Sequence, residues 1–417
     1  MKNITKTLAI LTPLLFVGCG SDSDSSSSSE KSIKGEIVVD FSASRMKKLL
    51  IDEGAITEDR VVFGYRAYKI PYITTDEEGL DVNASGLFVI PTGMPSTINK
   101  IGLSMVSDSH GTIFKNIDAP TVHGKIYGTP DGSPILLTSI GGFATLQADY
   151  IGFGDSKNHY HPYMLKESSA NATVDFIKQV KIFAKENNIK LNQQLFLTGY
   201  SEGGYVTMAT LKKIEEEGMD LSVSMAVPMA SATYSLTRVS NIMLNQEKMV
   251  LPAMVADLAY AHSIAYSEDV CSIVNEPYAS KLSTLFDGTH GMTDINSQLP
   301  TDIKGKNGLF KDEAIADYLA NDSHWYRIAM AENSVDAWTP QTALRFINCE
   351  GDEVAPFSES NMTFETMKNM GAEDIEIIPL EKRLGLSKNL GHMECALPSY
   401  KMVTEMFSNV RKETMGY

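Results

Sequence analysis

The sequence predicts an α/β fold, with a mostly parallel, doubly wound sheet and an inserted, mainly helical cap. From residue 100 onward, short apolar runs alternate with amphipathic stretches of helical spacing, the order typical of such a sheet. Between residues 230 and 336 helical segments dominate, with no clear buried strand. The chain has 417 residues, 43% of them hydrophobic, which is enough to bury a large core without help from disulfides or metals.

The alternation can be followed along the chain. Residues 60–91 contain three strand-like runs, at 61–65, 68–72 and 86–91, with a turn signal at 76–79, and they predict an antiparallel entry to the sheet. Further strands are expected at 101–106, 142–150, 195–198, 222–227, 343–347 and 375–379, and helices at 168–187, 205–217 and 359–370. Within the cap, helical segments are expected at 241–262, 312–319 and 324–331.

The predicted cap is rich in methionine, including Met243, Met249 and Met254. Methionine suits an adaptable apolar groove because its side chain is flexible and polarisable. It is equally common as an ordinary core residue. The sequence leaves both interpretations open.

The N-terminus is typical of an export signal. Lys2 and Lys6 precede an apolar run, residues 7–17, that is too short to span a bilayer. Cys19 then follows Gly18 as in a bacterial lipobox, although a plain secretory signal with an incidental cysteine is the alternative. We therefore expect a lipoprotein-type signal at 1–19 with Cys19 lipidated, so that the chain has a membrane anchor.

The rest of the chain divides into four expected parts. Residues 20–34 are rich in serine and predict a flexible tether. The first part of the core is expected at 35–229, the cap at 230–336 and the second part of the core at 337–417. Gly20 follows the cysteine, where aspartate would signal inner-membrane retention. We expect an exported protein of a Gram-negative bacterium, extracellular or anchored in the outer membrane.

Charge and cysteine content exclude several classes of partner and site. The net charge of −16 argues against nucleic acid and anionic lipid surfaces as partners, since both require basic patches. Export leaves Cys271, Cys349 and Cys395, which allow one disulfide and one free thiol but match no zinc spacing. His159 and His161 lack a nearby third ligand. No metal or other cofactor is expected.

The strongest chemical signal is the run Gly199-Tyr200-Ser201-Glu202-Gly203-Gly204. It follows a predicted strand and opens a predicted helix, the context in which a G-x-S-x-G turn presents a nucleophilic serine. The helix N-terminus beside it favours negative charge. Ser201 is therefore the candidate nucleophile. The bland alternative is a tight strand-to-helix turn with an idle serine.

A serine nucleophile needs a base, usually a histidine that a carboxylate orients. In the chain order serine, acid, histidine, His392 is the candidate base because it alone among the histidines follows the start of the last predicted strands. Asp352 follows Gly351 in the turn after the strand at 343–347 and is the candidate acid. Its competitors are Glu350, Glu353 and Asp336.

The two cysteines nearest these residues form a possible pair. Cys349 and Cys395 each lie three positions from Asp352 or His392. If the acid and the base meet, these cysteines are close enough to bond, provided that their Cα atoms are suitably separated. The pairings with Cys271 stay open.

An oxyanion hole requires two backbone N–H donors that are already in place. One is expected from Glu202, directly after the nucleophile. The other is expected from Gly111 or Thr112, in the His110-Gly111-Thr112 run after the strand at 101–106.

With these residues in view, the chain resembles secreted bacterial esterases and lipases of the α/β-hydrolase superfamily, including relatives of the fungal secretory lipases. The resemblance is carried by Ala84-Ser85-Gly86-Leu87 with Pro91, His110-Gly111-Thr112 with Ala119-Pro120, residues 148–156 (ADYIGFGDS), His161-Pro162-Tyr163, residues 199–204, Trp338-Thr339-Pro340, residues 351–356 and Gly391-His392. It implies ester hydrolysis by Ser201, Asp352 and His392. Asn348-Cys349 departs from the His-Gly that relatives often carry there.

The sequence thus predicts a serine-dependent carboxylic ester hydrolase acting on a small-molecule or lipid ester. The alternative is a secreted serine peptidase of the prolyl-oligopeptidase-like type, since the same three residues cleave amides. The roughly 50 residues between tether and sheet are too few for a propeller domain. A third hypothesis, a non-catalytic binding protein, would be favoured by loss of a triad member. The oligomeric state is not indicated.

Overall fold

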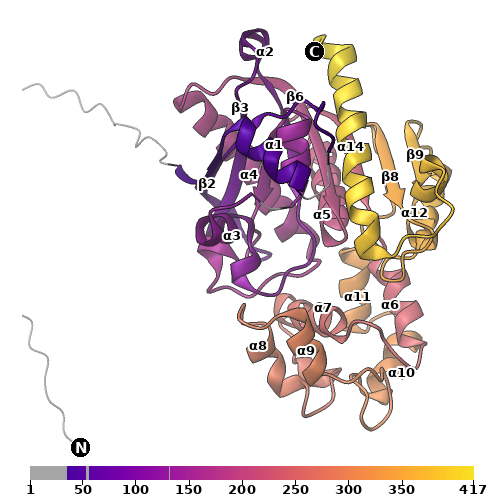
Figure 1. The fold of residues 1–417 in the computed structure, drawn as a ribbon. Coiled ribbons are helices and arrows are strands. Elements are labelled where there is room, and N and C mark those ends of the chain that lie inside the picture. The colour runs from indigo at the N-terminus through magenta and orange to yellow at the C-terminus, as the bar shows by residue number, and fades with distance from the viewer. Residues whose placement is uncertain (1–34, 53–55, 131) are drawn as a thin grey trace, which may run out of the picture. The chain divides into compact units, whose positions relative to one another are not determined.

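The computed structural model describes residues 35–52, 56–130 and 132–417 (Figure 1). The predicted signal at 1–19, the candidate lipidation site Cys19 and the tether at 20–34 lie outside these residues. In the described part of the chain, no helix combines the length and the apolar character needed to cross a membrane.

One nine-stranded sheet organises the described chain, with strand order β1-β2-β3-β5-β4-β6-β7-β8-β9. Pairing from β1 to β5 is antiparallel, and pairing from β5 through β4 to β9 is parallel. The strands are β1 Glu36–Phe41, β2 Gly64–Thr75, β3 Asp81–Thr92, β4 Leu103–Ser109, β5 Ala144–Ala148, β6 Leu191–Tyr200, β7 Val223–Met229, β8 Leu344–Asn348 and β9 Ile375–Pro379. The mostly parallel sheet predicted from the sequence is confirmed.

Helices cover both faces of this sheet. Those of the sheet domain are α1 Ala43–Asp52, α2 Ser96–Ile101, α3 Pro120–Tyr127, α4 Lys166–Glu186, α5 Glu202–Glu216, α12 Phe357–Asn369, α13 Leu380–Leu384 and α14 His392–Met415. Side chains alternate along a strand, so Leu195 and Leu197 of β6 pack in the same core as α4 and α5. Phe196, between them, packs with Phe407 of α14 on the other face.

The hairpin of β2 and β3 corrects one prediction. Residues 64–65 and 68–72 of the two predicted runs belong to a single strand, β2, while Val61, Val62 and Phe63 lie outside it. Pro71 does not interrupt β2, because β1 pairs only with residues Tyr65 to Lys69. The missing N–H of Pro71 therefore faces a stretch where β2 has no second partner strand.

The interval between β7 and β8, where the sequence predicts the cap, contains a group of helices that gather beyond one end of the sheet (Figure 1). They are α6 Leu236–Leu244, α7 Pro252–Ala265, α8 Leu282–Leu285, α9 Met292–Gln298, α10 Asp312–Ala320 and α11 Trp325–Glu332. The single helical segment predicted at 241–262 is two helices. Pro252 occupies the first turn of α7, where its fixed φ and missing N–H are tolerated, and it prevents continuation from α6.

Candidate active site

Ser201 occupies a strained turn between β6 and α5. Its φ of 60° and ψ of −120° fall outside the backbone regions that residues other than glycine usually adopt. Ser201 directly precedes α5, and its side chain makes no capping hydrogen bond. The hydroxyl thus stands at a helix N-terminus, where the first N–H groups have no intrahelical partners.

The glycines of the motif are required by close backbone approach. A Cβ atom on Gly199 would lie 2.3 Å from the carbonyl oxygen of Gly203. One on Gly203 would lie 1.9 Å from the carbonyl oxygen of Ser109, at the end of β4. Both separations are far below van der Waals contact, so any larger residue would push the turn away from β4 and misplace Ser201.

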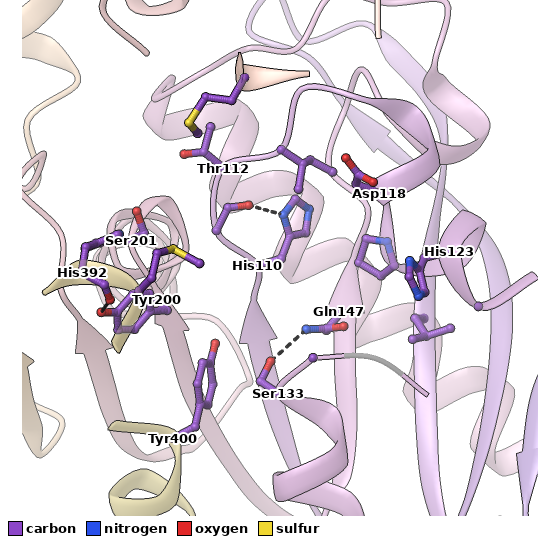
Figure 2. Close-up of a pocket in the computed structure, with 18 of the residues that line it drawn as sticks. His110, Thr112, Asp118, His123, Ser133, Gln147, Tyr200, Ser201, His392 and Tyr400 are labelled. Carbon is purple, nitrogen blue, oxygen red and sulfur yellow. Dashed lines mark hydrogen bonds between the residues drawn. The ribbon is translucent and has the colours of Figure 1, made fainter. Parts of the chain in front are cut away.

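Ser201 opens onto a cavity of about 570 Å³ whose lining also includes His392, Gly111 and Thr112 (Figure 2). The structure therefore brings the candidate nucleophile and base, 191 positions apart in the sequence, to one site. No hydrogen bond joins their side chains among the described residues. Such bonds are often long without substrate and tighten when substrate binds.

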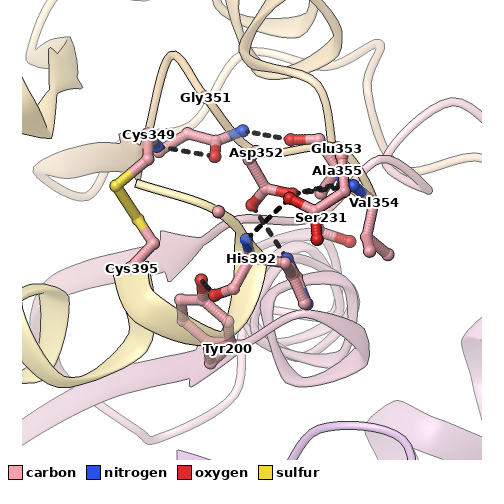
Figure 3. Close-up of polar contacts among 12 residues, drawn as sticks. Tyr200, Ser231, Cys349, Gly351, Asp352, Glu353, Val354, Ala355, His392 and Cys395 are labelled. Atoms are coloured by element: carbon pink, nitrogen blue, oxygen red, sulfur yellow. Dashed lines mark hydrogen bonds and ion pairs between the residues drawn. A yellow bond between two sulfur atoms is a disulfide. The ribbon is translucent and has the colours of Figure 1, made fainter. Parts of the chain in front are cut away.

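His392 is the first residue of α14, rather than part of a loop, and it is oriented by Asp352. Its Nδ1 lies 2.8 Å from Oδ2 of Asp352 (Figure 3), and the side chain of Asp352 is fully buried. Tyr200 donates a hydrogen bond of 2.6 Å to the carbonyl oxygen of His392. With Nδ1 bound to the carboxylate, Nε2 is the ring atom left to exchange a proton with a hydroxyl.

The backbone around Asp352 holds its carboxylate in place. Oδ1 accepts hydrogen bonds from the N–H groups of Val354, at 3.0 Å, and Ala355, at 2.7 Å. Asn348, at the position where the family resemblance fails, donates to the carbonyl oxygen of Ala355 at 2.9 Å. The amide of Asn348 thus closes the acid loop from inside.

The three competing acids make other contacts. Glu353 accepts from the backbone N–H of His392 at 3.1 Å, so it contacts the helix start and not the imidazole. Glu350 forms an ion pair with Lys382 at 2.6 Å. Asp336 pairs with Arg238 at 3.2 Å. Of the four candidates, Asp352 alone binds the His392 ring in the described structure.

Cys349 and Cys395 form a disulfide, with Cα atoms 6.1 Å apart. The bond links the loop that carries Asp352 to the first turns of the helix that carries His392 (Figure 3). Cys271 is free. The pair therefore ties together the two segments whose relative position sets the hydrogen bond between acid and base.

Replacing both Cys349 and Cys395 by alanine is expected to lower the free energy of unfolding by about 2–4 kcal/mol, because the unfolded chain loses a cross-link. Urea unfolding followed by fluorescence measures the change, and reduction of the unmodified protein should reproduce it. Cys271→Ala is the matched control, with an expected change near zero. Equal stability of the double variant and the control would contradict the prediction.

The candidate oxyanion-hole residues lie against the nucleophile. A Cβ atom on Gly111 would be 3.2 Å from the Tyr200 carbonyl oxygen and 3.6 Å from Cβ of Ser201, so the backbone at Gly111 lies close to the nucleophile. The loop is held by the hydroxyl of Tyr150, which donates to the carbonyl oxygen of His110 at 3.1 Å. Glu202, at the start of α5, supplies the other candidate N–H.

The side chain of Glu202 is a feature that sequence reasoning missed. It is 2% exposed, its Oε1 lies 3.0 Å from Nε2 of His161, and its Oε2 has no hydrogen-bond partner. Nδ1 of His161 lies 2.9 Å from the carbonyl oxygen of Ile151. Both ring nitrogens of His161 therefore face acceptors. Nδ1 donates one proton to Ile151, so a second proton, shared between Nε2 of His161 and Oε1 of Glu202, is needed for the hydrogen bond between these two side chains.

Charges in this buried cluster shift one another. Burial lowers the pKa of His161, but the charge and hydrogen bond of Glu202, together with Asp257 and the carbonyl oxygen of Ile151, outweigh burial and raise the pKa overall. Asp257, on α7 of the cap, is 3% exposed. Burial raises the pKa of Asp257 to about 8, with His161 opposing the shift and Glu202 adding to it. Near neutral pH, Asp257 is thus mainly protonated.

Asp257→Asn is expected to stabilise the protein at alkaline pH. The folded-state pKa of Asp257, about 8, lies above its ordinary value of 3.8, so the folded state binds the proton more tightly and its stability falls as pH rises between these values. The neutral amide avoids that loss. The stability gain should be near zero at about pH 4 and grow to a few kcal/mol above about pH 8.

Thermal unfolding from about pH 4 to 9 tests this sign. Asp322→Asn, an exposed cap residue, is the matched control and should show no such trend. A stability difference for Asp257→Asn that is flat across the range would contradict the assignment of a proton to Asp257.

The three cap methionines Met243, Met249 and Met254 line a second cavity, of about 280 Å³. Leu251, Met254, Glu353 and Val354 line both cavities, so the apolar groove adjoins the site of Ser201. Met249 is also 7% exposed and part of the core. The methionines thus pack in the cap and line the groove at the same time.

Among the described residues, no group of three or more histidine, cysteine, aspartate or glutamate side chains is placed to hold a metal ion. The two histidines considered for such a role differ in their environment. His161 is held by Ile151 and Glu202, whereas His159 is exposed.

Part of the chain that contains Ser201 matches a known protein family. A family model described as the prolyl oligopeptidase family matches residues 133–262, a stretch that includes Ser201 and ends before Asp352 and His392. A search of curated proteins found no match.

Solved structures match over most of the chain. A Legionella pneumophila protein provisionally assigned as a hydrolase aligns with a TM-score of 0.77 and 22% identity, over 92% of this chain and 98% of that one. The rice cell wall degrading esterase LipA from Xanthomonas oryzae aligns with a TM-score of 0.75 and 19% identity, over 92% and 98%. The chain has the α/β-hydrolase fold. Candida antarctica lipase A aligns less fully, with a TM-score of 0.56 and 14% identity, over 87% and 77%.

Proposed function

We propose that this α/β-hydrolase-fold protein is a serine-dependent carboxylic ester hydrolase that works through an acyl-enzyme on Ser201. One observation supports it above all. A serine in a strained turn shares a cavity with a histidine whose Nδ1 is fixed by a buried aspartate. That arrangement is suited to nucleophilic acyl transfer.

The reaction then follows from the geometry. The Ser201 hydroxyl attacks the ester carbonyl carbon while Nε2 of His392 takes its proton, and Asp352 stabilises the resulting imidazolium. The negative oxygen of the tetrahedral intermediate accepts hydrogen bonds from the backbone N–H of Glu202 and that of Gly111 or Thr112. His392 returns the proton to the departing alcohol. Water, activated by the same histidine, releases the acid and restores Ser201.

Ester rather than amide substrates are favoured by the cap. The groove beside the site is lined mainly by apolar side chains, including Met243 and Leu258, and such a surface suits an uncharged acyl chain. Two of the structurally similar proteins are named as an esterase and a lipase. We also propose that this chain is related to the secreted bacterial esterases and lipases that its sequence resembles.

A serine peptidase is the second candidate, because the prolyl oligopeptidase family model matches around Ser201. The same nucleophile and base cleave amides, so the match bears on substrate and not on mechanism. Before β2, the described residues form β1 and α1, with no propeller blade among them to admit only peptides.

Parallel assays decide between the two candidates. p-Nitrophenyl esters of two to twelve carbons and a prolyl p-nitroanilide peptide are compared with the same enzyme preparation. The proposal expects ester hydrolysis with a chain-length optimum and little anilide cleavage. A higher kcat/KM for the prolyl anilide than for the best ester would replace the ester hydrolase proposal with the peptidase.

We further propose that the protein is exported and anchored through a lipid on Cys19, in the outer membrane of a Gram-negative bacterium. The Cys349–Cys395 disulfide supports export, because such bonds persist in oxidising compartments. In cells, Cys19→Ala should move the protein from the detergent-extracted membrane fraction to the soluble exported fraction. Unchanged membrane association would contradict the anchor.

A further inference from the structure

One wall of the Ser201 cavity is polar and has no role in the mechanism above. It is formed by Ser133, by Gln147 of β5 and by Tyr400 of α14, which all line the cavity (Figure 2). All three side chains bind the same buried group, the carboxylate of Asp108 near the end of β4. We call these three residues the polar wall.

Each residue of the polar wall donates a hydrogen bond to the carboxylate of Asp108. Tyr400 donates to Oδ1 of Asp108 at 2.9 Å. Gln147 donates to Oδ2 at 2.9 Å through Nε2, and the Ser133 hydroxyl donates to the same oxygen. Asp108 is 1% exposed, so an ionised carboxylate there needs these donors to offset its burial.

Because the donor groups of the polar wall are bound to Asp108, the polar wall offers the cavity hydrogen-bond acceptors. The hydroxyl protons of Ser133 and Tyr400 are used on Asp108, which leaves their oxygen lone pairs. Nε2 of Gln147 is used on Asp108 and, at 3.3 Å, on Ser133. Oε1 of Gln147 has no hydrogen bond to any described residue. A buried surface of this kind is completed by a ligand that donates hydrogen bonds.

The polar wall stands next to the reacting groups. The ring of Tyr400 lies 6.3 Å from that of Tyr200, measured between centroids. Tyr200 directly precedes Ser201, and its ring lies 5.1 Å from that of His392. The cap lines the same cavity with Leu251, Met254 and Met292, so the cavity offers both an apolar and a hydrogen-bonding surface.

We propose that the polar wall binds a hydroxyl group of the substrate, so that the enzyme prefers esters carrying a hydroxyl near the scissile bond. This inference rests on the proposed ester hydrolase function. A neutral donor fits better than a cation, because Asp108 is covered by its three donors and is not presented for an ion pair. The hydroxyl could belong to the alcohol part or to the acyl part of the ester, and both supply the same donor.

The ionisation of Asp108 sets the assay conditions. Burial raises the pKa of Asp108 to about 7, while the hydrogen bonds from Ser133, Tyr400 and Gln147 oppose the shift. A protonated Asp108 would have to donate one of these bonds itself, which would turn a donor toward the cavity. Assays at about pH 8 keep the carboxylate ionised and the wall in its acceptor form.

The test compares substrates that differ by one hydroxyl, using kcat/KM ratios within one enzyme preparation so that the fraction of folded enzyme cancels. Ethyl butyrate is paired with 2-hydroxyethyl butyrate, for the alcohol part, and with ethyl 3-hydroxybutyrate, for the acyl part. We expect one pair to favour the hydroxylated ester by about 10-fold, the effect of one well-made hydrogen bond. The pair that does so identifies which part binds.

Variants locate the preference. In Gln147→Leu, and separately in Tyr400→Phe, the ratio should fall to near 1. Gln193→Leu, the same change at an exposed position of β6, should keep the wild-type ratio. Equal rates for both members of each pair in the wild type, or a preference that survives in both wall variants, would overturn the inference while leaving ester hydrolysis intact. Absence of any ester hydrolysis would instead refute the proposed function and, with it, this inference.

Discussion

Ser201→Ala is expected to lower kcat/KM for p-nitrophenyl butyrate by about 1,000-fold or more, since it removes the atom that forms the acyl-enzyme. The strained backbone at position 201 tolerates alanine no worse than serine. Folding should therefore be unchanged, with Tm within a few degrees of the wild type. Steady-state release of p-nitrophenol, read beside the thermal unfolding curve, measures both quantities.

Ser96→Ala, at an exposed position of α2, is the control and should keep wild-type activity. A rapid burst of p-nitrophenol, equal to the enzyme concentration, should appear in the wild type if deacylation is slow, and should be absent in Ser201→Ala. Retention of more than about one tenth of wild-type activity by a folded Ser201→Ala protein would remove Ser201 from the mechanism.

The second large effect is expected at the acid. Asp352→Asn should lower kcat by about 100- to 10,000-fold. The amide keeps the size of the side chain but can place an N–H where Oδ2 now accepts from Nδ1 of His392. The imidazole would then carry its proton on Nε2, facing Ser201, and could not act as a base.

Neighbouring carboxylates provide the matched controls. Glu353→Gln removes a charge one residue away, but Glu353 binds the backbone N–H of His392 and not its imidazole, so an effect below about 10-fold on kcat is expected. Glu350→Gln breaks the surface pair with Lys382 and should have less effect still. A greater loss in Glu353→Gln than in Asp352→Asn would transfer the acid role to Glu353.

The sequence alone predicts the candidate site residues that lie in a short, recognisable motif or in a fixed chain order. The G-x-S-x-G run combines glycines, a serine and a strand-to-helix change within six residues, and the structure shows the steric reason at Gly199 and Gly203. Chain order then reduced the candidate bases to His392. Asp352 could be ranked first but not separated from Glu353, because the choice depends on which side chain faces the imidazole.

What sequence could not supply were contacts between distant segments. The pairing of Glu202 with His161 joins residues 41 positions apart, and Asp257 reaches the same cluster from the cap. The hydrogen bond from Tyr400 of the polar wall to Asp108 joins residues still farther apart in the sequence, by 292 positions. No local pattern marks such pairs, because each member alone resembles an ordinary surface or core residue.

Local signals also failed where tertiary context decided the outcome. The runs predicted at 61–65 and 68–72 do not show that one strand, β2, contains residues of both, or that Pro71 is tolerated in it because the pairing with β1 stops at Lys69. Pro252 was a usable signal for the start of α7, and it would have divided the helical segment predicted at 241–262. The sequence predicts no element at the residues of β1 and α1, because their short apolar pattern is weak without the partner strand β2.

Covalent labelling of the folded protein with a fluorophosphonate, followed by peptide mass mapping, tests the proposed chemistry most directly. The reagent reacts with a serine only when a base activates the hydroxyl and an oxyanion hole receives the phosphoryl oxygen. We expect a single adduct, on the peptide containing Ser201, and labelling slowed by at least about 100-fold in His392→Ala. An unlabelled folded protein, or an adduct confined to another serine, would contradict the assignment of Ser201 and His392 as nucleophile and base.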